Sequence, residues 1–140
     1  MACTYIIDPG LGFVYSRGSG VITAEDLLSH TVKLAADTAL DPSFRQVVDF
    51  RAVAKLAFGI GTIREVARIN PFNRTTRRAF VLGDDLPYGV IRMYLLFLGM
   101  TARGIEVFRE MAPAIRWLGY EGADAAALIE LTAIRELIAA

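Results

Sequence analysis

The sequence predicts a single α/β domain with a mixed, mostly parallel sheet, and three observations support this fold class. The chain has 140 residues, the length of one domain. After residue 23, short apolar runs alternate with segments of helical periodicity, a pattern typical of strands joined by crossover helices. The first two strand-like runs instead flank Pro9 and Gly10, a turn signal that predicts an antiparallel pair.

The first helix is predicted to begin after Thr23, which is a good N-cap, and to carry two acids in its first turn, where the helix dipole favours negative charge. The residues expected on its buried face are Leu27, Leu28, Thr31, Leu34 and Ala35. The next strand is predicted over residues 46–50, QVVDF, whose nearly continuous apolar character is typical of a parallel strand buried on both faces.

The remaining elements continue the alternation of helix and strand. A second helix is expected over 59–70, with Ile60, Ile63, Val66 and Ala67 on its inner side. The third helix is expected to have Pro87 in its first turn, and the helix over 110–120 to end at Gly119. The order of these elements is a strand at 77–85, a helix at 86–100, a strand at 104–108 and a helix at 110–120.

The last segment, residues 121–140, is predicted to form an added amphipathic helix beyond a main domain that spans residues 1–120. Its apolar stripe consists of Ala127, Leu128, Leu131, Ile134 and Ile138. This stripe either packs on its own domain or contacts a second copy in a homodimer.

Composition narrows the classes of partner. Acids and bases balance at 15 each, so bulk charge favours neither nucleic acid nor more than peripheral membrane association. The mean hydropathy of +0.42 is high and predicts either a thoroughly buried core or an apolar surface that contacts a ligand or a partner. Because the N-terminus has no basic segment followed by an apolar one, we expect no signal peptide and a cytoplasmic protein.

The sequence has no pattern typical of a metal site, a cofactor site or a catalytic constellation. His30 is the sole histidine and is expected near the exposed side of its helix, without a second ligand at metal-binding spacing. Cys3 is the sole cysteine, so an intrachain disulfide is excluded. The arginines of residues 73–78, NRTTRR, are interpreted as a solvated loop.

Charged residues follow the predicted strands at one edge of the sheet, where open α/β sheets bind ligands. They are Asp49, Arg51, Asp84, Asp85, Arg109 and Glu110, and the favoured interpretation is a structural role, in which they mark the ends of the strands and cap the turns that follow. Arg92 stands in an otherwise apolar helix, four residues after Tyr88, and a buried arginine needs a counter-ion. We therefore expect Arg92 to pair with Asp49 or Asp85, either as a polar anchor for a ligand or as a structural ion pair between helix and sheet.

Three stretches together resemble the bacterial SpoIIAA-like proteins, relatives of the STAS domain of anti-sigma-factor antagonists. They are VVDFRAV (47–53), GDDLPYGVIRMYLLF (83–97) and IEVFREMAPAIRWLGY (105–120), and the similarity covers roughly residues 5–120. The resemblance implies a single α/β domain that acts by binding and not by catalysis. It also implies similarity to Sec14-type lipid-binding domains.

Two functions follow from this resemblance. The first is a non-enzymatic module that binds an apolar or lipid-like ligand between helices and sheet, with Asp49, Arg51, Phe58, Ile63, Tyr88 and Arg92 as candidate binding residues. The second is a STAS-type regulatory module that binds a protein. STAS antagonists are phosphorylated at the start of the helix that follows the Asp-bearing strand, and the sole hydroxyl of this segment is that of Thr62. The sequence departs from the family's Ser/Thr motif at this point.

Overall fold

The computed structural model describes residues 2–84, 86, 89–99, 104–120 and 130. Its five strands form one sheet in the order β1-β2-β3-β4-β5. β1 and β2 are antiparallel, and the other neighbouring pairs are parallel. The strands span Cys3–Asp8, Phe13–Thr23, Arg45–Ala57, Arg78–Leu82 and Ile105–Phe108. The predicted α/β fold class with a mixed, mostly parallel sheet is therefore confirmed.

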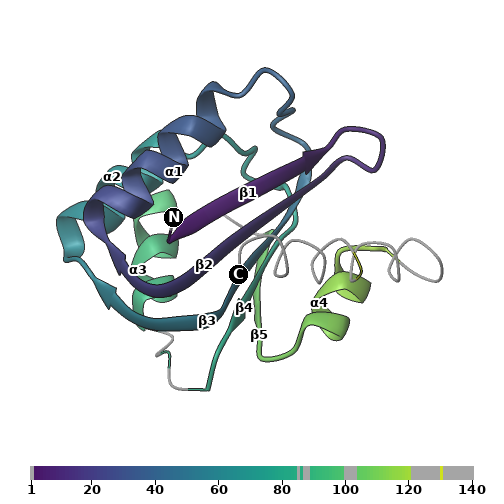
Figure 1. The fold of residues 1–140 in the computed structure, drawn as a ribbon. Coiled ribbons are helices and arrows are strands. Elements are labelled where there is room, and N and C mark those ends of the chain that lie inside the picture. Colours follow the sequence, from purple (N-terminus) through teal and green to yellow (C-terminus); the bar gives the residue numbers. More distant parts are fainter. Residues whose placement is uncertain (1, 85, 87–88, 100–103, 121–129, 131–140) are drawn as a thin grey trace.

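Three helices cover one face of this sheet and a fourth covers the other (Figure 1). The strands from β2 to β5 are neighbours in sequence and in space, so crossovers of one hand place every connecting helix on the same face. These helices are α1 (Ala24–Ala36), α2 (Ile60–Ile69) and α3 (Gly89–Leu98). The helix α4 (Met111–Trp117) follows β5 and packs on the opposite face.

Local signals explain two helix ends. Thr23 forms a capping box with Asp26, in which each side chain binds the other residue's backbone N–H. Gly119 has a φ of +94° after α4. Its N–H donates to Arg116, and the N–H of Tyr120 donates to Ile115, which is the Schellman pattern. Both predicted ends are confirmed.

The structure also corrects the sequence analysis in two helices and one strand. Ala35 and Ile60 are exposed, although helical periodicity placed them on buried faces. The strand predicted to end near residue 50 runs on to Ala57, because β3 stays paired with a long β2. β4 ends at Leu82, opposite Phe50. Asp49 is therefore inside β3, at the level where β4 stops.

The core is divided by the sheet into two layers, because successive side chains of a strand point to opposite faces. Val48 and Phe50 pack with Ile63 of α2 and Ile91 of α3. Val47 instead packs with residues of α4, which include Ala114 and Ile115. The two layers hold different polar groups, which are described below.

The prediction for the helix at 121–140 lies outside the described residues, apart from position 130, and so do Asp85, Pro87 and Tyr88. Within the ranges given above, no helix has both the length and the apolar character needed to cross a bilayer.

Candidate functional site

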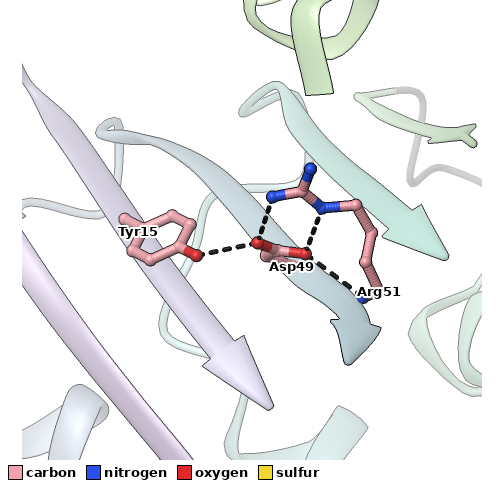
Figure 2. A network of polar contacts seen from close by, with 3 residues as sticks. All are labelled: Tyr15, Asp49 and Arg51. Atoms are coloured by element: carbon pink, nitrogen blue, oxygen red, sulfur yellow. Dashed lines mark hydrogen bonds and ion pairs between the residues drawn. The ribbon is translucent and has the colours of Figure 1, made fainter. Parts of the chain in front are cut away.

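On the α4 side of the sheet, Asp49 forms a network with Tyr15 and Arg51 (Figure 2). The hydroxyl of Tyr15 donates to Oδ2 of Asp49 at 2.8 Å. The guanidinium of Arg51 binds both carboxylate oxygens, with Nε 2.9 Å from Oδ1 and Nη2 2.8 Å from Oδ2. The backbone N–H of Arg51 donates to Oδ1 at 3.2 Å.

This network stabilises the ionised form of Asp49. The side chain of Asp49 is 2% exposed and that of Arg51 is 39% exposed. Burial raises the pKa of Asp49, but the hydrogen bonds from Arg51 and Tyr15 and the charge of Arg51 outweigh it, so the pKa lies below its usual value. With four donors on two oxygens, the carboxylate has little capacity left to accept a proton or a ligand group. Asp49 therefore has a structural role in β3.

The predicted pair between Asp49 and Arg92 is wrong. Arg92 is exposed on α3, and α3 covers the face opposite to the one toward which Asp49 points. The alternation of side chains along β3 thus prevents the contact. The counter-ion of Asp49 is Arg51, two residues away on the same face of the strand.

The other charged residues of this edge that the structure describes do not gather around Asp49. Asp84 and Glu110 are exposed. The guanidinium of Arg109 donates to the backbone carbonyl oxygens of Gly83 and Leu86, so it holds the loop that follows β4. For these residues the structural interpretation is the better one.

A cavity of about 90 Å³ lies on the other face, between the sheet and the helices α1, α2 and α3. Two candidate binding residues, Phe58 and Ile63, are part of its wall, and Phe50 of the VVDFRAV stretch is another. The rest of the apolar wall comes from all three helices and from the strands, and includes Leu27, Leu34, Val48, Val66, Phe72, Phe80, Val90 and Ile91.

A row of polar side chains crosses this apolar wall. Gln46 and Arg78 are directly opposite each other in the pairing of β3 with β4, and Nε of Arg78 donates to Oε1 of Gln46 at 2.8 Å. Nε2 of Gln46 donates to the hydroxyl of Ser16 at 2.9 Å. At the other end of the row, Nη1 of Arg78 lies 2.9 Å from the hydroxyl of Tyr94 on α3. All four residues are buried and line the cavity.

Arg78 is the residue that the sequence analysis missed. The arginines of residues 73–78 were interpreted as solvated, although the strand predicted over 77–85 includes Arg78; this residue begins β4 and is 7% exposed. Its guanidinium lies over the rings of Phe72, Phe80 and Tyr94, at 4.7, 5.4 and 5.4 Å from their centroids. The signal was present in the alternation of Arg78, Phe80 and Leu82, which places all three on one face of a buried strand.

Two titratable groups of the cavity wall are held in their neutral forms. Burial, together with the charge of Lys33, lowers the pKa of His30 to about 4. Burial and the charge of Asp26 raise the pKa of the Cys3 thiol to about 11. His30 was expected near the exposed side of α1, but it lies against the ring of Tyr5 and faces the cavity. The cavity environment thus disfavours charge on both groups.

A second cavity, of about 240 Å³, adjoins the amino end of β4. Asn70, Phe72 and Arg78 line both cavities. The second cavity is more polar, since Asn73, Arg74 and Thr76 contribute to it. Arg78 therefore lies where an apolar space meets a polar one.

The described residues include no cluster of three histidine, cysteine or acidic side chains that could hold a metal ion. Thr62 lies in the first turn of α2 and is partly exposed. Of the six candidate binding residues, Phe58 and Ile63 share the first cavity, Asp49 and Arg51 lie on the opposite face, and Arg92 is exposed. Tyr88, the sixth, is outside the described residues.

Comparisons with known proteins agree with the fold. Neither protein-family models nor curated proteins gave a match to this sequence. A solved structure that is similar belongs to an uncharacterised protein of the DUF3478 family with a SpoIIAA-like fold, from Shewanella loihica PV-4. The TM-score is 0.59 and the identity is 18%, over 84% of this chain and 94% of that chain. The chain thus has a SpoIIAA-like fold, as its three sequence stretches predicted.

Proposed function

We propose that the protein is a non-enzymatic binding module that takes an apolar small ligand into the cavity between the sheet and helices α1, α2 and α3. The observation that supports this function is the wall of that cavity, which combines many apolar side chains with a few polar ones. Small-molecule sites in proteins have this composition. The fold likeness is compatible with a binding module, and the saturated Asp49 offers no base for catalysis.

Native mass spectrometry of freshly purified protein, followed by thermal-shift measurements with short alkyl alcohols and acids, tests this proposal. We expect bound ligand or a rise in melting temperature. Val90 lines the cavity from α3, so Val90→Phe fills space and should reduce the shift. Leu96 on the same helix is 69% exposed, and Leu96→Phe is the matched control. Equal shifts for both variants would contradict a ligand in this cavity.

A second candidate function is a regulatory module that binds a protein partner. The SpoIIAA-like fold favours it, and Thr62 is placed in the first turn of the helix that follows β3. If Thr62 is phosphorylated in the native cell, intact-mass analysis will show added phosphate that Thr62→Ala removes. A partner whose capture is the same for the wild type and for Thr62→Ala would rule out a switch at this residue.

A further inference from the structure

We infer that the cavity ligand carries a carboxylate, and that Arg78 binds it. This inference rests on the proposed function and narrows it to one chemical class: small apolar monocarboxylates. The observation behind it is the combination of a buried cation, an apolar cavity and the lack of an acidic counter-ion in the described part of the chain.

The positive charge of Arg78 faces no negative charge in the described wall of the cavity. The first cavity is lined by two arginines, Arg17 and Arg78, and by no acidic residue of the described chain. Arg17 already has an interaction partner. The ion pairs found in the described ranges join Arg51 to Asp49 and Arg68 to Glu65. Arg78 thus has neutral partners only, although a buried charge is costly without an opposite one.

The guanidinium of Arg78 uses only part of its hydrogen-bond donors. Nε of Arg78 donates to Gln46, and Nη1 lies 2.9 Å from the hydroxyl of Tyr94 and 3.4 Å from Oδ1 of Asn70. These contacts occupy three of the N–H groups of a guanidinium and leave the two on Nη2. Among the described residues we find no acceptor for Nη2. A carboxylate oxygen is the acceptor that matches such a donor best, since charge-assisted hydrogen bonds are the strong ones.

The cavity volumes and the charge of Arg78 limit the size and the charge of the ligand. The first cavity, of about 90 Å³, is smaller than a cavity of about 150 Å³ that holds benzene, so an alkyl chain of about four to eight carbons also needs the adjoining space of about 240 Å³. A phosphate monoester carries a charge of about −1.5 to −2, more than one guanidinium neutralises. A monocarboxylate matches the single charge of Arg78.

Ligand-observed NMR on the wild-type protein at pH 7.5 tests the inference with hexanoate, hexanol, hexylamine and hexyl phosphate. We expect hexanoate to bind at least tenfold more tightly than each of the others. Hexanol that binds as tightly as hexanoate would overturn the inference but leave the apolar site intact. If none of these ligands binds, the proposed function fails as well. Tighter binding of hexyl phosphate would overturn the assignment to carboxylates.

Substitutions test whether Arg78 is the residue that binds the carboxylate. Arg78→Met removes the charge and keeps an unbranched side chain, so hexanoate should lose at least tenfold in affinity while hexanol should not. Arg92 is exposed on α3, and Arg92→Met is the matched control, with unchanged binding of both ligands. An equal loss for hexanoate and hexanol in Arg78→Met would indicate a structural role only. If Arg78→Met does not fold, the wild-type comparison decides alone.

Discussion

Asp49 and Arg78 are two buried charges on opposite faces of one sheet, and their surroundings differ in one respect. Asp49 has a counter-ion and four donors on its two oxygens. Arg78 has amide and hydroxyl partners and three aromatic rings. A counter-ion within the fold thus makes a buried charge structural. A buried charge with neutral partners instead retains electrostatic attraction for an anion from outside.

The largest effect on stability is expected for a substitution of Gly104. The carbonyl oxygen of Gly104 accepts a hydrogen bond from the N–H of Arg78 at 2.7 Å. A Cβ at this position would lie 2.1 Å from the backbone oxygen of Thr76. Gly104→Ala should therefore disturb the start of β4 and lower the free energy of unfolding by about 3 kcal/mol. Denaturant unfolding measures this change.

Gly61 in α2 is the matched control, because a Cβ there meets nothing within 4 Å. Gly61→Ala should raise the free energy of unfolding by about 0.5–1 kcal/mol. If Gly104→Ala is as stable as the wild type, the close approach of Gly104 to the backbone of Thr76 does not constrain the fold.

The second effect is at Asp49. Asp49→Asn removes the charge that Arg51 binds, and we expect a loss of about 2 kcal/mol of stability. Because the pKa of Asp49 is lowered in the folded protein, its contribution is present above pH 4 and is lost as the pH falls through the folded-state pKa. Urea unfolding of both proteins between pH 7 and pH 2 measures this, and the difference between them should shrink at low pH.

Asp84→Asn, at an exposed position, is the control and should leave stability within about 0.5 kcal/mol of the wild type. A loss of binding in Asp49→Asn with unchanged melting would show that Asp49 serves the ligand and not the strand.

The third effect is at His30, on the wall of the cavity that holds Arg78. The folded-state pKa of about 4 lies below the ordinary value of 6.5, so the folded protein binds fewer protons than the unfolded chain between these values. The free energy of unfolding should therefore fall as the pH decreases from 6.5 toward 4. His30→Gln should make the free energy of unfolding less dependent on pH in this range. An unchanged dependence would show that the imidazole of His30 is solvated in the folded protein.

The smallest effect on stability is expected for Arg78→Met. This change relieves the burial of a charge but removes hydrogen bonds to Gln46, Asn70 and Tyr94. Because the two contributions oppose each other, the free energy of unfolding should stay within about 1 kcal/mol of the wild type. A loss of stability as large as that expected for Asp49→Asn would show that Arg78 is as structural as Asp49.

The fold was largely predictable because its signals are local. Pro9 and Gly10 mark the hairpin turn, Thr23 marks a helix start, and Gly119 marks a helix end. The length of β3 was not predictable in this way, since its second half owes its strand structure to pairing with β2. Strand pairing between distant segments overrides local sequence preference.

The candidate site was less predictable, since it depends on which face of its strand or helix each side chain occupies. Phe58 and Ile63, both named as candidate binding residues, line the same cavity. Arg92 and Arg78 were misjudged in opposite directions. Arg92 was expected to be buried in an apolar helix and Arg78 to be solvated, but the structure exposes the first and buries the second. The burial of each arginine follows from the face of the helix or strand on which it lies, and not from the polarity of the residues next to it in sequence.

The hydroxyl of Tyr120 contacts the carbonyl oxygens of Leu11 and Gly12, at 3.0 and 3.1 Å, across more than 100 positions of the chain. During synthesis from the N-terminus, the strands and helices that enclose the first cavity emerge by residue 98. The cover of the opposite face needs another 22 residues, which takes on the order of a second or more at about 5–20 residues per second. The nascent chain thus has a period in which Phe13, Val47 and Val81 await α4, and this face is the one on which a chaperone would find apolar surface.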